Sequence, residues 1–326
     1  MRTLRLSLVG AVILMLLGGP SGEVVGQTED AARTPIPSVG CGVSEVDVGD
    51  PWGSMDIEGL TRTWRLAVPA AYDGATPLPL VILLHGGGGS NDQISFVAGG
   101  GFSDEHGFVA VAPQAWEGFW IWNDVDWESV EPDPSMVNAD IAFFDALIER
   151  LGEDLCLDLA RVYATGFSWG GVGLAALSCA LEDRVAAIAP VGLTVDFGDA
   201  CVMDRPVPVL AFQSANDPTV PFDGGFPSPD PPDMPLVDWP GWDASTPERV
   251  TSIAVRNGCE PKPLSEMLTA DIERLVWACP SGAEVELVIT KDEGHGWPGN
   301  MGGVITMDID ATEMIWEFFE QHPMPE

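Results

Sequence analysis

Ser168 lies in a G-x-S-x-G pattern that is typical of a nucleophilic serine. Residues 161–165 before the pattern favour a short buried strand, and the small and apolar residues 170–181 after it favour a tightly packed helix. A strand, this pattern and a helix together form a nucleophile elbow, in which Gly166 and Gly170 permit a sharp turn and the serine hydroxyl stands at a helix N-terminus. The alternative is a plain turn between two packed elements. We predict that Ser168 is a nucleophile.

Serine is a weak nucleophile until a base accepts its proton, and histidine is the usual base. The chain has four histidines. His85 precedes a glycine run and is expected to order that loop, His106 falls in a helix, and His322 lies in the C-terminal tail. His295 stands between two glycines in a loop directly after an apolar strand. We therefore predict that His295 is the base.

Asp217 is predicted to complete a catalytic triad with Ser168 and His295, as the carboxylate that orients the base. It follows a strand that ends at Phe212, and the carboxyl ends of strands are where parallel sheets build sites. The order Ser168, Asp217, His295 is the order found in α/β-hydrolases. Because the chain has 50 acidic residues, the position of this carboxylate, and not its presence, singles it out.

Two backbone N–H groups are predicted to stabilise the negative charge of a tetrahedral intermediate. One belongs to Trp169, the residue after the nucleophile. The other belongs to the glycine run after His85, where we favour Gly87, with Gly86 and Gly88 as alternatives. A phosphate-binding loop is a poor alternative because no Gly-Lys-Ser/Thr follows.

Apolar stretches typical of strands alternate with helical patterns along most of the chain. Strands are expected at 60–68, 80–84, 108–112, 161–165, 186–191, 207–212 and 285–290, and helices at 138–151, 170–181, 250–256 and 311–319. Strand 60–68 shows enough alternation for a sheet edge. The continuous apolar runs indicate strands that are buried on both faces. This order predicts an α/β fold with a mostly parallel sheet covered by helices on both faces, in one domain over residues 41–320.

The ends of this domain have a different character. Residues 1–26 carry two arginines, an apolar run and small residues, which is the layout of a secretory signal peptide. Residues 27–40 are expected to form a loose mature N-terminus. Within the domain, the Pro- and Trp-rich residues 221–247 are expected to form an insertion. The mature protein is therefore expected to be exported, extracellular or periplasmic.

The chain is strongly acidic, with a formal net charge of −36 and only two lysines, Lys262 and Lys291. Such a surface repels nucleic acids and anionic membranes, so neither is an expected partner. The acidic residues are spread along the chain, which suits a solvated surface in salty surroundings.

Six cysteines in an exported chain suggest disulfides, and six can pair in 15 ways. Cys259 and Cys279 flank a short segment and are the pair expected first. The pairing of Cys41, Cys156, Cys179 and Cys201 stays open.

Several motifs together give a resemblance to a known family. They are the segments 84–90 (LHGGGGS), 161–168 (RVYATGFS), 217–221 (DPTVP), 257–259 (NGC), 295–299 (HGWPG) and the closing helix 311–319. In this order the chain resembles the secreted polyhydroxybutyrate depolymerase and feruloyl esterase family of α/β-hydrolases over residues 41–320. The resemblance implies hydrolysis of carboxylic esters through Ser168, Asp217 and His295, without a metal or organic cofactor. Bulky Trp169 departs from the small or amide residue that the family often has after the serine.

The resemblance leaves the substrate open between feruloyl esters on plant polysaccharide, polyhydroxyalkanoates and small acetyl or aryl esters. Trp116, Trp120, Trp122 and Trp297 are candidate substrate contacts, because tryptophan stacks on sugar and phenolic rings, although such residues also simply pack. A secreted serine peptidase of the same fold and a catalytically silent binding protein are the alternatives.

Overall fold

The computed structural model describes residues 33–42, 52–57, 59–95, 101–120, 139–225, 243–291, 294–300 and 305–325. The chain divides into two compact units, residues 1–34 and residues 35–326. Only Arg33 and Thr34 of the first unit are described, so the predicted signal peptide and residues 27–32 lie outside the described residues. The second unit carries the fold and the candidate site.

A ten-stranded sheet runs through the second unit in the order β1-β2-β4-β3-β5-β6-β7-β10-β9-β8. The strands are β1 Trp52–Ile57, β2 Leu60–Ala67, β3 Leu78–Leu84, β4 Val109–Pro113, β5 Leu157–Phe167, β6 Ala187–Val191, β7 Val209–Ser214, β8 Leu264–Met267, β9 Ile272–Val276 and β10 Val285–Thr290. The six strands from β4 to β10 in this order are parallel, and the two strands at each end pair antiparallel. The predicted mostly parallel α/β fold is confirmed.

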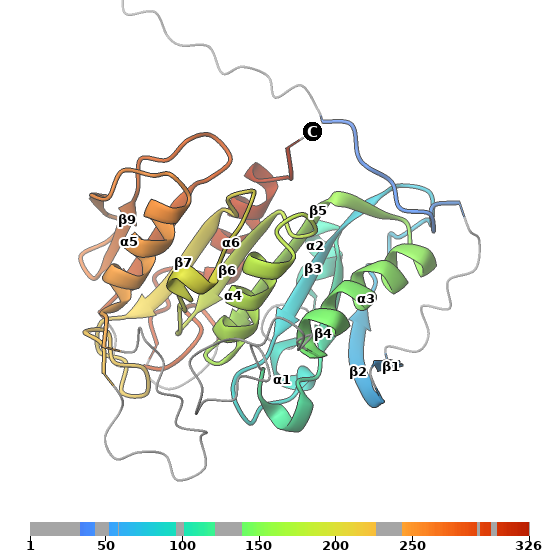
Figure 1. Ribbon diagram of the computed structural model, residues 1–326, viewed down its shortest axis with the longest axis horizontal. Helices are drawn as coiled ribbons and strands as arrows, with labels where there is room; N and C mark the ends of the chain where they lie inside the picture. The colour runs from blue at the N-terminus through green and yellow to red at the C-terminus, as the bar shows by residue number, and fades with distance from the viewer. Residues whose placement is uncertain are drawn as a thin grey trace, which may run out of the picture. The chain divides into compact units, whose positions relative to one another are not determined.

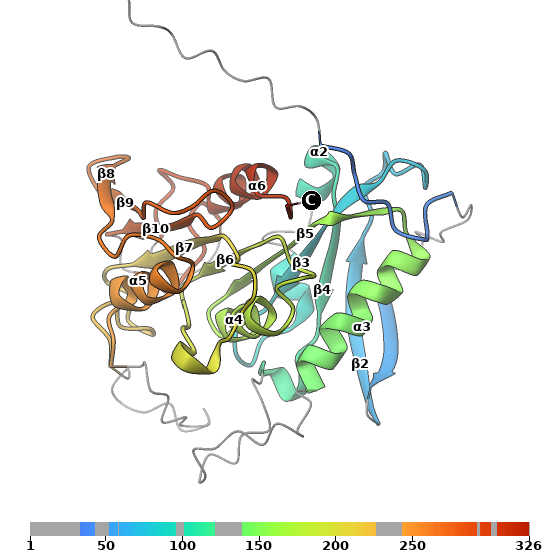
Figure 2. The same cartoon turned by 45° about the horizontal axis from the view of Figure 1, so that its top comes forward.

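Helices cover both faces of this sheet (Figure 2). They are α1 Asn91–Ile94, α2 Phe102–His106, α3 Ala139–Asp154, α4 Gly170–Ala180, α5 Thr246–Arg256 and α6 Ala311–Gln321, with short 3₁₀ turns at Trp116–Gly118 and Gly198–Ala200. Helices α3, α4 and α5 pack on one face around Phe143, Leu174 and Val250, and α6 packs on the other through Ile315 and Phe319. Each face therefore has its own hydrophobic core, as the continuous apolar strands require.

The expected strand at 60–68 forms, but its expected edge position is wrong. Strand β1 pairs with β2 on its outer side, from Trp52 against Arg65 to Ile57 against Leu60. Strands β8 and β9 extend the opposite end and were not expected. All four residues of β8 are exposed, so this strand has no buried face that could give a sequence pattern.

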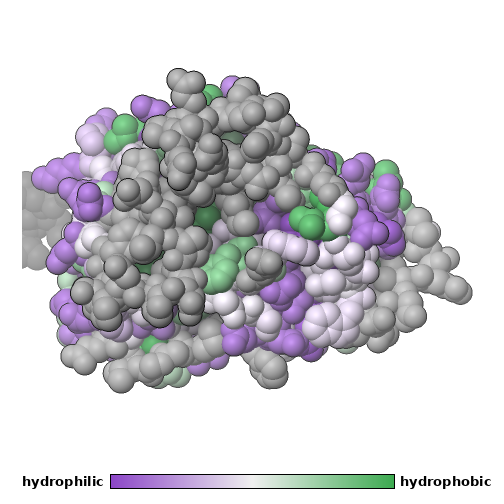
Figure 3. All heavy atoms as spheres, turned by 60° about the horizontal axis from the view of Figure 1, so that its bottom comes forward, coloured by the Kyte–Doolittle hydropathy of each residue, from purple (hydrophilic) through white to green (hydrophobic). Residues whose placement is uncertain are grey.

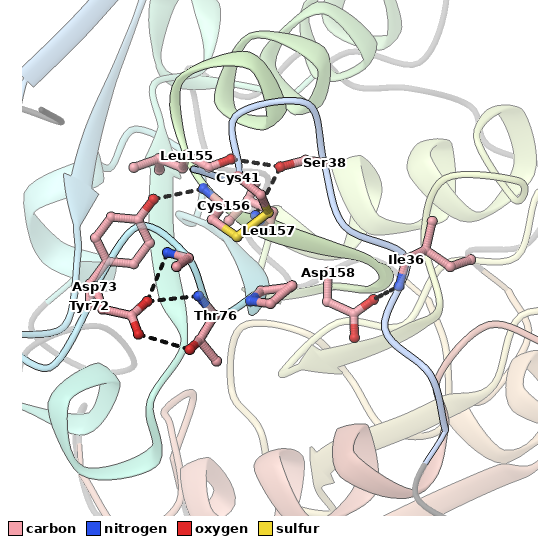
Figure 4. Close-up of a disulfide and its surroundings, with 12 residues drawn as sticks. Ile36, Ser38, Cys41, Tyr72, Asp73, Thr76, Leu155, Cys156, Leu157 and Asp158 are labelled. Atoms are coloured by element: carbon pink, nitrogen blue, oxygen red, sulfur yellow. Dashed lines mark hydrogen bonds between the residues drawn. A yellow bond between two sulfur atoms is a disulfide. The ribbon is translucent and has the colours of Figure 1, made fainter. Parts of the chain in front are cut away.

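The segment expected to be a loose N-terminus is in part firmly attached (Figure 4). The N–H of Ser38 donates to the carbonyl of Leu157 at 2.8 Å, and the Ser38 hydroxyl donates to the carbonyl of Leu155 at 2.6 Å. A disulfide then joins Cys41 to Cys156. Residues 35–40 thus belong to the folded unit, because backbone hydrogen bonds and a covalent link hold them at the start of β5.

Two further disulfides join Cys179 to Cys201 and Cys259 to Cys279. The second is the pair that the sequence singled out.

Within the described part of the chain, no helix is both long enough and apolar enough to cross a membrane.

Most of the expected insertion at 221–247, including Trp242, lies outside the described residues, which resume at Asp243. Its two ends are adjacent, since the N–H of Thr246 donates to the carbonyl of Phe222 at 2.8 Å. Helix α5 starts there, four residues before the expected 250, because Ser245 and Glu248 form a capping box at its N-terminus.

The carboxyl ends of the parallel strands point toward the bottom of Figure 1, where α1 follows the loop after β3. Figure 3 views the molecule from that side. Hydrophilic residues dominate the coloured surface there, with a few hydrophobic residues near the centre of the face. The loops that follow β3, β5, β7 and β10 carry the candidate site.

Candidate active site

Ser168 stands at a strained turn between β5 and α4. Its φ of 51° makes it the one non-glycine residue with positive φ in the described part of the chain. Its N–H donates to the carbonyl of Val191 at 2.8 Å, and its carbonyl accepts from Gly171 at 2.8 Å. A Cβ at Gly170 would lie 2.5 Å from the carbonyl oxygen of Leu84. Close packing against β3 therefore demands glycine after the turn, and the elbow predicted from the sequence has the required geometry.

Asp217 and His295 are in direct contact. His295 Nδ1 lies 2.7 Å from Asp217 Oδ2, and the Asp217 side chain is only 1% exposed. Asp217 Oδ1 accepts the N–H groups of Thr219 and Val220 at 2.8 and 2.9 Å, and Oδ2 also accepts from Gln213 Nε2 at 2.9 Å. A carboxylate surrounded by donors is an acceptor only. His295 must therefore carry a proton on Nδ1, which leaves Nε2 as a free acceptor.

The free nitrogen of His295 lies beside the elbow. The imidazole packs on the ring of Phe167 with centroids 4.8 Å apart, and its Cε1 lies 3.2 Å from where a Cβ at Gly192 would stand. His295 Nε2 is buried and has no hydrogen-bond partner among the described residues. No hydrogen bond joins it to the Ser168 hydroxyl among the described contacts. Such bonds are often long before substrate binds and tighten in the complex.

The glycine run after β3 lies against the elbow. A Cβ at Gly86 would lie 3.3 Å from Ser168 Cβ, and one at Gly87 would lie 3.4 Å from Trp169 Cβ. In the described structure, the N–H groups of Gly87 and Trp169 have no hydrogen-bond partner, whereas Gly88 donates to the carbonyl of Gly118 at 2.9 Å. Two free N–H donors next to the serine can donate hydrogen bonds to an oxyanion and so stabilise its developing negative charge.

His85 holds this glycine run in place. It is 1% exposed, its Nδ1 lies 2.8 Å from the carbonyl of Gly86, and its Nε2 accepts the N–H of Ala115 at 3.1 Å. Burial lowers the pKa of this imidazole below its ordinary value, while the hydrogen bond to Gly86 opposes that shift. His85 is therefore a neutral structural group, as expected for a residue that orders the loop.

The other two histidines are engaged at α6, away from the elbow. His106 lies 3.4 Å from Glu313 and packs on Phe102, and His322 lies 3.4 Å from Glu284. Of the four, only His295 contacts the elbow and a buried carboxylate together.

Two of the tryptophans predicted to contact substrate are core residues. Trp120 is 1% exposed, and its Nε1 donates to the carbonyl of His85 at 2.8 Å. Trp297 is fully buried, and its Nε1 donates to Thr312 Oγ1 at 3.0 Å. Their indole faces are covered by protein, so the predicted stacking on substrate is wrong for both. Trp116 is 41% exposed and stays a candidate; Trp122 lies outside the described residues.

Several known proteins are similar to this chain in sequence or in fold. No protein-family model matches the chain. The chain is 27% identical to "Feruloyl esterase C" of Emericella nidulans over 79% of this chain and 83% of that protein. It is 30% identical to "Probable feruloyl esterase C" of Aspergillus niger over 58% of this chain, and spans 65% of that protein. It is 30% identical to "Putative esterase NocK" of Nocardia uniformis over 74% of this chain and 72% of that protein.

Among solved structures, the acetyl xylan esterase from Aspergillus awamori superposes with a TM-score of 0.51. It is 12% identical, and the match covers 82% of this chain and 99% of that one. At this identity the likeness concerns the fold alone, and it is the fold that the ten-stranded sheet already indicates. With the similarity to NocK and to the feruloyl esterases, the chain belongs to the feruloyl esterase-like family of α/β-hydrolases and is an ester hydrolase.

Proposed function

We propose that this ester hydrolase works through a covalent acyl-enzyme on Ser168, with His295 as the base and Asp217 as the carboxylate that orients it. The observation that carries the proposal is the pairing of His295 with Asp217 at 2.7 Å, which leaves His295 Nε2 unpartnered beside the strained serine. An acceptor nitrogen held in one tautomer next to a nucleophile is the requirement for general-base catalysis.

In this mechanism Ser168 Oγ attacks the ester carbonyl carbon and passes its proton to His295 Nε2. The carbonyl oxygen becomes an oxyanion that accepts hydrogen bonds from the N–H groups of Gly87 and Trp169. Collapse of the tetrahedral intermediate breaks the bond to the alcohol, which takes the proton from His295. Water then attacks the acyl-enzyme by the same route and releases the acid and free Ser168.

We propose feruloyl-type esters as the substrate class, with polyhydroxyalkanoate-type esters as the second candidate. The names of the relatives from Emericella nidulans and Aspergillus niger support the first class. Trp116, partly exposed on the loop that contacts the glycine run, can stack on a phenolic ring. The second class rests on the motif resemblance alone.

We also propose that the protein is secreted. The N-terminal 26 residues have the layout of an export signal. The three disulfides suit an oxidising compartment.

A hydrolysis panel tests the substrate proposal. Purified protein is assayed with methyl ferulate, p-nitrophenyl acetate, p-nitrophenyl butyrate and hydroxybutyrate oligomers, and with an anilide of the same acid. We expect the highest kcat/KM on methyl ferulate and no turnover of the anilide. A preference for the oligomers would reassign the substrate, and efficient anilide cleavage would indicate a peptidase.

A further inference from the structure

The indole of Trp169 is turned into the protein and makes a hydrogen bond that the serine chemistry does not require. Trp169 is only 7% exposed, so little of the indole ring can face a substrate. Trp169 Nε1 donates to the carbonyl of Trp120 at 2.9 Å, and Trp120 Nε1 donates to the carbonyl of His85 at 2.8 Å. These two bonds form a continuous chain, the Trp169–Trp120–His85 relay, from the elbow to His85, the residue directly before the glycine run.

The loop at 115–120 that carries Trp120 is fixed to the same place by further contacts. The carbonyl of Gly118 accepts from Gly88 at 2.9 Å. Phe119 meets the Trp169 ring edge to face, with centroids 5.9 Å apart and an interplanar angle of 88°. Phe119 Cε1 also lies 2.8 Å from where a Cβ at Gly87 would stand. The loop therefore touches both segments that supply the proposed oxyanion donors.

We propose that the Trp169 side chain is a positioning residue for the oxyanion hole. Through Trp120 it sets the separation between the N–H of Gly87 and the N–H of Trp169 itself. This inference rests on the proposed function, because it assumes that both donors serve a tetrahedral intermediate on Ser168.

The physical reason is that the two donors come from distant parts of the chain. Both must stand 2.7–3.1 Å from one oxyanion, and removal of one such donor lowers turnover by about 10²–10³. Loss of an indole hydrogen bond shifts a donor without removing it, so the expected effect is smaller, about tenfold in kcat. Since the misplaced donor acts on the transition state, KM should change little.

Three variants test the relay: Trp169→Phe, Trp120→Phe and the double variant. Each removes an indole N–H and keeps an aromatic ring. We expect each single variant to lower kcat for p-nitrophenyl acetate about tenfold, with KM within about twofold. The inhibition constant of phenylboronic acid, which forms a tetrahedral adduct with an active-site serine, should rise by the same factor. Because the two bonds act in series, the double variant should lose about tenfold and not a hundredfold.

Trp316→Phe is the matched control. Trp316 is 5% exposed and stacks on Phe108 in the core formed with α6, on the other face of the sheet from α4. It should lower the melting temperature without changing kcat or the boronic acid constant. If Trp169→Phe fails to fold, β-(3-benzothienyl)alanine at position 169 keeps the ring shape and lacks only the N–H.

Unchanged kcat in the Trp169 variants would overturn the inference, as would a loss of kcat without weaker boronic acid binding, or additive losses in the double variant. Failure of the proposed function looks different. In that case the wild-type protein would itself not bind phenylboronic acid, and Ser168→Ala would retain activity.

Discussion

Replacement of Asp217 by Asn turns one oxygen of a buried carboxylate into an NH2 group and preserves the shape of the side chain. Oδ1 accepts from two backbone N–H groups, and Asn can keep both contacts. Oδ2 accepts from Gln213 Nε2 at 2.9 Å and faces His295 Nδ1 at 2.7 Å. In the variant, the new NH2 group therefore meets two donors.

The two neighbours can respond in different ways. Gln213 Oε1 is buried without a partner among the described residues, so its amide can turn and offer this oxygen to the new NH2 group of the variant. This turn of the Gln213 amide breaks one long hydrogen bond, from Gln213 Nε2 to the carbonyl of Val220 at 3.4 Å. His295 can relieve the clash only by moving its proton from Nδ1 to Nε2, and Nε2 then cannot accept the proton of Ser168.

The variant should therefore be stable and inactive. We expect the free energy of unfolding to change by no more than about 1 kcal/mol, the net worth of one hydrogen bond. Turnover should fall about 10⁴-fold through the wrong tautomer, which corresponds to about 5.5 kcal/mol of activation free energy. Urea unfolding and steady-state hydrolysis of p-nitrophenyl acetate measure the two quantities on the same sample.

Asp158→Asn is the control for loss of a buried negative charge. The Asp158 side chain is 4% exposed and pairs with Arg161 at 2.7 Å near the start of β5, at the opposite end of that strand from Ser168. Its turnover should stay at the wild-type level. Turnover of Asp217→Asn within tenfold of wild type, or an equal loss in both variants, would show that the assignment of Asp217 is wrong.

Three further predictions concern stability. Replacing both Cys41 and Cys156 by Ala should lower the free energy of unfolding by up to about 4.7 kcal/mol, the value for a loop of ~100 residues, because their separation is 115; equal urea midpoints for variant and wild type would contradict this. Because the pKa of His85 is lowered in the folded state, the unfolded state binds a proton on this residue more readily. The free energy of unfolding should therefore fall as the pH drops below 6.5, the ordinary pKa of histidine. His85→Gln should flatten this part of the plot of unfolding free energy against pH, and an unchanged slope would exclude His85 as its source. Finally, a net charge of −36 should make the melting temperature rise between 0.05 and 1 M NaCl through screening, and a fall would refute the idea of a surface suited to salt.

The sequence is most informative where residues follow strands. Ser168, Asp217 and His295 each lie in the loop or turn that follows a strand, and parallel strands bring their carboxyl ends to one edge of the sheet. The role of His85 could also be predicted from the sequence, because the four glycines that follow it have no side chains to hold the loop in place. The parallel sheet and its two covering layers follow from the continuous apolar runs.

Residues that depend on distant partners could not be predicted in the same way. The indole N–H of Trp120 finds a carbonyl 35 positions away, and that of Trp169 one 49 positions away. Nothing local to a tryptophan distinguishes such a core contact from a ring that faces substrate. Strand β8 has no buried residue to reveal it. The sequence favoured the Cys259–Cys279 pair, but only the folded chain could pair the other four cysteines.

The acyl-enzyme on Ser168 is the central claim, and mass spectrometry of the intact protein tests it most directly. Protein mixed with p-nitrophenyl acetate and quenched in acid within the first turnovers should carry one acetyl group, and peptide mapping should locate it on Ser168. The His295→Ala variant should acquire the group far more slowly, and Ser168→Ala should acquire none while remaining folded. Continued hydrolysis by Ser168→Ala, or an adduct on a different residue, would contradict the account.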